Sequence, residues 1–351
     1  VIIYHAFPSV LPAGFIGVDI FFVISGFLIT QALNKPTQET TLQRLNHFYR
    51  RRILRLAPAL ILLLLTCFIL GWFLLLPHEF RALNKHISSS ALFLNNFVLF
   101  AETGYFDTAS QKKPLMHLWS LAVEEQFYLL WPITCLLLMR GKKLLSGTLI
   151  LATVSLLLCL YYSSVATAAA FYFPVTRLWQ FLWGALLAIQ LNDIGRQYSS
   201  SNLVSTTGIL LLLTACWAIN ATTTYPSLYA ILPSMAATIL IFSARSQLNL
   251  YLIGNSVLVG IGKMSYSLYL WHWPILALLF IRLGTDAPVE LRAIALGIGL
   301  LAAIASYFLI ENPLRYTPKP IAKYLLMSLG LLSTATLINY TTPFLPSYHA
   351  A

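Results

Sequence analysis

Long apolar runs separated by short basic loops are the feature that most constrains this chain. The runs recur about every 25 to 35 residues, which suits helices that cross a bilayer and is too long for barrel strands. Hydrophobic residues fill 58% of the 351 positions and charged residues only 9%, which excludes a soluble domain of this size. The sequence therefore predicts an all-α, polytopic helical membrane protein.

About eleven transmembrane spans are expected from the lengths of the apolar runs. They are 1–6, 14–33, 57–76, 118–139, 144–162, 171–191, 203–219, 228–243, 265–281, 290–310 and 322–338. Because the chain starts within an apolar run and without Met, residues 1–6 are expected to be the end of a truncated span. Both chain ends are interpreted as those of a fragment.

The positions of Lys and Arg predict the orientation of these spans. Basic residues gather in segment 34–57 and in the loop after 139, which should therefore be cytoplasmic. Segment 77–117 then begins and ends outside, so its apolar stretch 84–101 is predicted to be re-entrant or interfacial. This topology accounts for the net charge of +11 without nucleic acid and places the C-terminus outside.

His5 and Asp19 are the first candidates for chemistry. His5 lies at the outer end of the first span, and Asp19 lies roughly 7–8 Å into the next one. Neighbouring antiparallel helices can bring the two together, and a His oriented by a carboxylate is a common general base. A helix-end His and a capping Asp explain the same residues, and both interpretations stay open.

Arg52 and Arg55 are candidates for binding phosphate. They lie three residues apart, hence on one helical face at the cytoplasmic edge. Two guanidinium groups there can clamp phosphates. Ordinary positive-inside anchoring explains the same charges, and charge alone favours that simpler interpretation.

Residues 117–132 form an apolar stretch that carries His117, Glu124 and Glu125. His117 and Glu124 are seven residues apart and share a helical face, whereas Glu125 points about 100° away. Intramembrane acids usually face a cavity, so a lined cavity is one interpretation. The alternative is a hydrogen-bonded network that locks helices together.

His272 lies in the middle of a predicted span, between Trp271 and Trp273. Pro274 cannot donate a backbone hydrogen bond and frees a carbonyl one turn back. His272 is either functional or a packing histidine that donates to that carbonyl, and the two interpretations are equally weighted. The four cysteines have no metal-ligand spacing, so no metal is expected.

Taken together and in chain order, these segments resemble the membrane-bound acyltransferase family 3. The matching segments are 4–5, 17–30, 52–55, 117–128, 265–274 and 311–313. The resemblance implies transfer of an acyl group, usually acetyl, from cytoplasmic acyl-CoA to a hydroxyl of an extracytoplasmic glycan. It also implies a bacterial inner membrane, with acetyl-CoA as the donor substrate and membrane lipids as surroundings.

The resemblance gives the candidate residues their expected roles. His5 matches the essential histidine of the family, and Arg52-Ile-Leu-Arg55 matches its donor-binding motif. The expected catalytic residues are His5, Asp19 and Glu124. The expected donor-binding residues are Arg52, Arg55 and Ser25, the last from the Ser-Gly-Phe motif. The expected acceptor-binding residues are His117, Glu125 and His272.

The resemblance also sets the expected domain organisation. Residues 1–316 should form the acyltransferase domain, and 317–351 an extra transmembrane helix with an external tail. Some family members carry such a span before an SGNH-type domain, which this chain stops short of. The acceptor is open among O-antigen of lipopolysaccharide, peptidoglycan, exopolysaccharide, a glycolipid and an antibiotic.

Two other functional classes fit the same residues. A carrier would move a lipid-linked glycan or an acyl group without forming a bond, since intramembrane His and Glu also suit proton coupling. A structural or sensory membrane protein is the second alternative.

Overall fold

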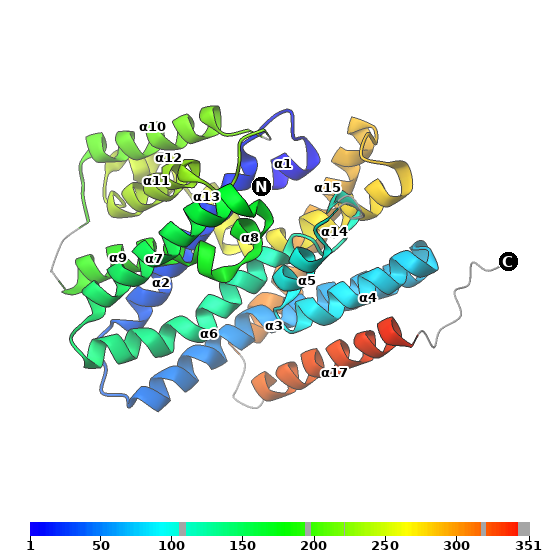
Figure 1. Cartoon of the computed structure of the whole chain (residues 1–351), viewed down its shortest axis with the longest axis horizontal. Coiled ribbons are helices and arrows are strands. Elements are labelled where there is room, and N and C mark those ends of the chain that lie inside the picture. Colours follow the sequence, from blue (N-terminus) through cyan, green and yellow to red (C-terminus); the bar gives the residue numbers. More distant parts are fainter. Residues whose placement is uncertain (105–109, 194–197, 221, 317–320, 343–351) are drawn as a thin grey trace. The chain divides into compact units, whose positions relative to one another are not determined.

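A computed structural model of the chain (Figure 1) describes residues 1–104, 110–193, 198–220, 222–316 and 321–342. Within these ranges all regular secondary structure is helical, which confirms the predicted fold class. A helix satisfies every backbone N–H and C=O within its own segment, which is what the interior of a bilayer demands.

The α-helices follow one another along the chain with short connections. They are α1 (Ile2–Ala6), α2 (Gly17–Leu33), α3 (Thr41–Leu74), α4 (Pro77–Ala91), α5 (Asn95–Glu102), α6 (Leu118–Arg140), α7 (Leu144–Val165), α8 (Thr167–Tyr172), α9 (Pro174–Asp193), α10 (Asn202–Ala218), α11 (Ile231–Phe242), α12 (Gln247–Leu252), α13 (Ser256–Lys263), α14 (Ser265–Leu283), α15 (Val289–Ser306), α16 (Asn312–Arg315) and α17 (Ile321–Thr341). Short 3₁₀ segments are η1 (Gly14–Ile16), η2 (Ser110–Lys112) and η3 (Leu228–Ala230), and η4 (Tyr307–Glu311) is a π-helical turn.

Seven helical segments in the described part of the chain are long and apolar enough to cross a membrane. They are Gly14–Leu33, Thr41–Leu74, Leu118–Arg140, Leu144–Val165, Ser265–Leu283, Val289–Arg315 and Ile321–Thr341. The predicted spans 203–219 and 228–243 appear as shorter apolar helices, so the count of eleven stays a prediction. The stretch 84–101 is divided between α4 and α5, and neither of these is among the seven.

The chain divides into two compact units, and unit 1 consists mainly of Ile3–Leu45 and Val123–Gly262. Within it α2 packs against α9, α9 against α7, and α10 against α11. The ring of Phe181 on α9 is stacked between two others, with centroids 4.3 Å from Phe22 and 4.5 Å from Phe127. These aromatic contacts fill the space between α2, α6 and α9.

Two glycines set the separation of α2 and α9. A Cβ added at Gly26 would lie 1.8 Å from the carbonyl oxygen of Phe181, and one at Gly184 would lie 2.0 Å from that of Val23. The two backbones are therefore in direct contact. Small residues allow such approach in membrane helices, where packing rather than the hydrophobic effect holds helices together.

Unit 2 consists of Asn46–Ala122 and the chain from Lys263 onward. In it α14 packs against α15, and α17 runs beside α4 (Figure 1). Ser88 and Ser333 are joined by a hydrogen bond of 3.0 Å across the α4–α17 contact. The apolar core of the unit is built from α3, α4, the start of α6 and α14; it includes Leu60, Leu63, Leu64, Leu83, Ile87, Leu115, Leu121 and Leu270.

The glycine contact makes a prediction about stability. Gly26→Ala forces α2 away from α9. We therefore expect the unfolding free energy of this variant in detergent to be lower than that of the wild type by about 3 kcal/mol or more. Gly330→Ala on α17 is the matched control, because a Cβ there meets nothing within 4 Å. Thermal unfolding of the purified variants checks this, and equal stability of the two would contradict the close contact.

Candidate functional site

His5 lies in the last turn of α1 beside three half-buried aromatic rings of unit 1. Its ring centroid is 5.4 Å from that of Tyr4, Tyr4 is 5.4 Å from Phe15, and Phe15 is 4.9 Å from Tyr225, all edge to face. Gly14 permits this packing, because a Cβ there would meet the Cβ of Tyr4 at 2.7 Å. The histidine therefore belongs to an aromatic cluster, partly open to its surroundings.

Asp19, on the first turn of α2, is almost fully buried, and three side chains contact its carboxylate. Arg177 Nη1 on α9 lies 3.0 Å from Oδ1 and forms an ion pair in which both side chains are buried. Gln180 Nε2 donates to the same oxygen, and the Tyr225 hydroxyl donates to Oδ2. The expected pairing of His5 with Asp19 stays a prediction, whereas Arg177 is an observed partner.

Arg177 is also placed by aromatic contacts. Its guanidinium carbon lies 5.1 Å from the ring centroid of Phe171 and 5.8 Å from that of Tyr225. Its Nε donates to the carbonyl of Phe171 at 3.2 Å. A cation buried in an apolar bundle is stabilised by such rings and by its carboxylate together.

Ser25, Glu124 and Tyr128 form a second buried group in unit 1. Ser25 Oγ donates to Glu124 Oε1 at 2.7 Å, and the Tyr128 hydroxyl donates to Ser25 Oγ at 2.9 Å. Tyr128 also contacts Glu124 directly, one helical turn further along α6. The expected donor-binding Ser25 and the expected catalytic Glu124 are thus hydrogen-bonded to each other. Glu125 is only half-buried, as its different helical face predicts.

His117 and His272 come together in unit 2, with ring centroids 5.5 Å apart. His117 Nε2 hydrogen-bonds the carbonyl of Leu270 at 3.1 Å, which is the carbonyl that Pro274 leaves without its helical donor. His272 Nδ1 instead lies 2.7 Å from the carbonyl of Tyr269. The packing alternative considered for His272 was therefore wrong about the donor, because His117 takes that role.

Tyr269 ties this histidine pair to the start of α6. Its hydroxyl donates to the carbonyl of His117 and lies 3.0 Å from Ser120 Oγ. Since Tyr269, His272 and Ser120 belong to α14 and α6, the contact fixes one helix against the start of the other within unit 2.

Arg52 and Arg55 lie on α3 and are half-buried. Arg55 acts electrostatically on the buried carboxylate of Glu311, which accepts a hydrogen bond from Ser267 Oγ at 2.7 Å. Glu311 ends the π-helical turn η4, and the chain continues as α16. The π turn lies directly before Asn312 and Pro313, and such turns are frequent at functional sites.

Sequence reasoning missed several partners of the predicted residues. They are Arg177, Gln180, Tyr225 and Tyr128. A usable signal existed for Arg177, because the predicted topology leaves it alone within a span, as it does Asp19. Opposite charges inside a bilayer are expected to pair. Tyr128 lies four residues after Glu124, a spacing that puts both side chains on one helical face. No comparable signal marked Gln180 or Tyr225.

No group of three or more His, Cys, Asp or Glu residues could hold a metal ion within the ranges that the structure describes. The expectation of a metal-independent protein stays a prediction. The donor set of the observed clusters is instead suited to hydrogen bonding and proton transfer, since it combines carboxylates with hydroxyl, imidazole and guanidinium groups.

Comparisons with known proteins agree on one family. The family model described as "Acyltransferase domain" matches residues 1–312. The O-acetyltransferase OatA of Staphylococcus aureus (strain NCTC 8325 / PS 47) is 32% identical over 335 residues, covering 90% of this chain and 55% of the relative. A candidate O-acetyltransferase of strain COL, SACOL0978, is 35% identical with the same coverage. The chain spans about half the length of these relatives. No solved structure matches significantly.

The buried ion pair predicts a double-mutant result. Arg177→Met leaves the Asp19 carboxylate buried without its cation, so we expect a loss of about 3–5 kcal/mol in unfolding free energy. Adding Asp19→Asn removes the other charge and should restore most of that loss. Arg51→Met, at an exposed position, is the control. Denaturation in detergent of the wild type, the two single variants, the double variant and the control checks this, and additive single effects would contradict the pair.

Proposed function

We propose, since the chain belongs to the acyltransferase domain family, that it is an integral membrane O-acyltransferase. It transfers an acyl group, acetyl in the first instance, from cytoplasmic acyl-CoA to a hydroxyl of an extracytoplasmic glycan such as a surface polysaccharide. The family match over residues 1–312 is the observation that carries this proposal. The names of the two S. aureus relatives support oxygen as the acceptor atom and acetyl as the group.

The donor is proposed to bind at Arg52 and Arg55. Guanidinium groups bind phosphate oxygens through parallel N–H donors, and coenzyme A carries several phosphates. The Glu311 carboxylate interacts electrostatically with Arg55 and accepts a hydrogen bond from Ser267. These contacts support a pre-organised basic site rather than loose anchoring. Ser25 is assigned to the donor side as well, through its bond to Glu124.

The acceptor is proposed to react at His5. The imidazole takes the proton of the sugar hydroxyl while the oxygen attacks the thioester carbonyl. The carbon–sulfur bond then breaks, the acyl group stays on the sugar oxygen, and coenzyme A leaves as a thiolate that takes up a proton. The partly open rings of Tyr4, Phe15 and Tyr225 support a sugar as acceptor, because pyranose C–H faces pack on aromatic rings.

The remaining predicted residues have supporting roles in this proposal. Glu124, bonded to Ser25 and Tyr128, is a buried proton-exchanging group. Asp19 is assigned to the His5 side of unit 1, where Arg177 balances its charge. His117, His272 and Glu125 are assigned to the acceptor side.

The location proposed for the protein follows from the loop charges. They support a multi-pass protein of the bacterial cytoplasmic membrane with its C-terminus outside. Beyond the acyltransferase domain proposed at 1–316, α17 is proposed to be the extra span, and the rest of the predicted segment 317–351 lies almost wholly outside the described residues.

A carrier without bond formation is the competing function, and purified protein in liposomes separates the two. We expect labelled acetyl to move from acetyl-CoA to a bacterial glycan acceptor in proportion to enzyme and to time. Movement of a lipid-linked glycan across the membrane with no CoA release would instead favour the carrier.

Replacing His5 tests the base. We expect His5→Ala to lower the transfer rate by about 10²–10⁴-fold, the usual range for loss of a general base. His78→Ala, at an exposed position on α4, should leave the rate unchanged. Radiolabel transfer at saturating substrates measures both, and a near-normal rate for His5→Ala would refute the role.

Replacing Arg55 tests the donor site. Arg55→Lys keeps the charge and loses the planar fork, so we expect the KM for acetyl-CoA to rise about tenfold or more. The KM for the glycan should stay the same. Arg51→Lys, exposed on the same helix, is the matched control. Equal effects of Arg55→Lys and Arg51→Lys on the KM for acetyl-CoA would indicate that Arg55 only anchors the helix at the membrane.

A further inference from the structure

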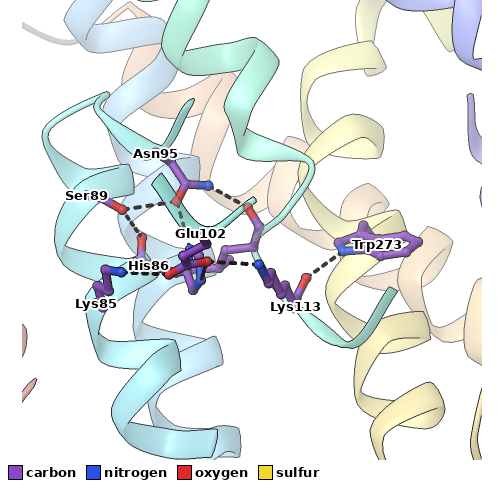
Figure 2. A network of polar contacts seen from close by, with 8 residues as sticks. Lys85, His86, Ser89, Asn95, Glu102, Lys113 and Trp273 are labelled. Atoms are coloured by element: carbon purple, nitrogen blue, oxygen red, sulfur yellow. Dashed lines mark hydrogen bonds and ion pairs between the residues drawn. The ribbon is translucent and has the colours of Figure 1, made fainter. Parts of the chain in front are cut away.

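A polar cluster in unit 2 joins α4, α5, the segment before α6, and α14 (Figure 2). Its centre is the carboxylate of Glu102, the last residue of α5. Lys85 Nζ lies 2.8 Å from Oε1, while Lys113 Nζ at 2.9 Å and His86 Nε2 at 3.2 Å lie near Oε2. The side chains of His86 and Lys113 are buried, whereas those of Glu102 and Lys85 are partly exposed.

Asn95 has its amide orientation fixed by this cluster. Its Nδ2 donates to the carbonyl of Leu115 at 2.9 Å, so Oδ1 must point the other way. There Oδ1 accepts from Ser89 Oγ at 3.0 Å and faces His86 Nδ1 at 3.0 Å. A flipped amide would place its oxygen against the oxygen of Leu115, where neither atom can donate.

His86 therefore faces an oxygen acceptor at each ring nitrogen (Figure 2). A neutral imidazole donates from one nitrogen only, whereas the imidazolium donates from both. Burial alone would raise the pKa of the Glu102 carboxyl, but the hydrogen bonds and charges of His86, Lys85 and Lys113 outweigh it and hold that pKa well below its usual range. The carboxylate that faces His86 is thus a charged acceptor.

The groups that face His86 are few among the described residues. Glu102 of α5 carries the charge that lies against the His86 ring, and Lys85 and Lys113 contact the same carboxylate. The helix α17, which packs on α4, places the uncharged Ser333 against Ser88, two residues further along α4.

The segment before α6, residues 113–117, connects this cluster to α14. The carbonyl of Lys113 accepts a hydrogen bond of 2.9 Å from Trp273 Nε1 (Figure 2), and His117 binds the carbonyl of Leu270. The amide of Asn95 holds the middle of the segment at Leu115. Segment 113–117 is therefore fixed on one side by Glu102 and Asn95 and on the other by α14.

We propose that His86 is an imidazolium in this protein and that His86 and Glu102 are positioning residues, which hold segment 113–117 so that His117 and His272 keep their places. This rests on the proposed function only where it assigns these two histidines to the acceptor side. A neutral His86 could keep only one of these two hydrogen bonds.

The full chain in lipid nanodiscs, labelled with ¹⁵N at histidine and tryptophan, tests the proposal without any activity. We expect both ring nitrogens of His86 to carry protons at pH 7, with His86→Gln used for assignment. In Glu102→Gln we expect the indole ¹⁵N–¹H signal of Trp273, assigned by Trp273→Phe, to shift from its wild-type position. A neutral wild-type His86, or an unmoved Trp273 signal, would overturn the proposal.

Kinetics add a readout that a purely structural role would not move. Glu102→Gln should raise the KM for a glycan acceptor about tenfold and leave the KM for acetyl-CoA unchanged. The reason is that the segment positions His117 and His272, which are assigned to the acceptor and not to the donor. Glu290→Gln, exposed on α15, is the control. Equal rises in both KM values would count against positioning, whereas no wild-type transfer at all would count against the proposed function and leave the spectra to decide the assignment.

Discussion

The backbone contact between α2 and α9 is the constraint on which unit 1 depends. Gly26 and Gly184 let the two helices touch, and this brings Arg177 and Gln180 of α9 within reach of Asp19 on α2. A carboxylate buried without a cation and donors is too costly to keep. A steric property of two glycines is therefore what allows a charged pair to exist inside an apolar bundle.

Buried polar side chains in both units are joined to partners far away in the sequence. Ser25 on α2 binds Glu124 on α6, and Ser267 on α14 binds Glu311 on η4. Among apolar helices there is little hydrophobic drive to associate, so such bonds contribute to holding the bundle together. Ser25, Glu124 and Asp19, which were expected to carry chemistry, also connect helices, so a substitution at any of them is expected to affect folding.

The sequence predicted where apolar helices lie more reliably than what faces them. The expected spans 144–162 and 265–281 are close to α7 and α14, because length and hydropathy decide these boundaries. The helix that holds most of span 57–76 begins earlier, at Thr41, because the Arg-rich segment before the span is helical as well. Basic residues exclude a segment from the bilayer but not from a helix.

Partners were harder to predict for a physical reason. Helical periodicity says that Glu124 shares a face with His117, but it does not say which other helix lies opposite. The structure gives Ser25 of α2 as the contact of Glu124 from another helix. Only opposite charge carries long-range information in a single sequence, and Asp19 with Arg177 is the pair where that information was present.

The proline in α14 has a consequence for acid–base chemistry. The carbonyl of Leu270, which Pro274 leaves without a helical donor, can only accept, so the hydrogen in its bond with His117 belongs to Nε2. The neutral form of that histidine is thereby fixed as one tautomer, and any further proton must arrive at Nδ1. A residue that lacks an N–H thus decides which nitrogen of a histidine on another part of the chain can act as a base.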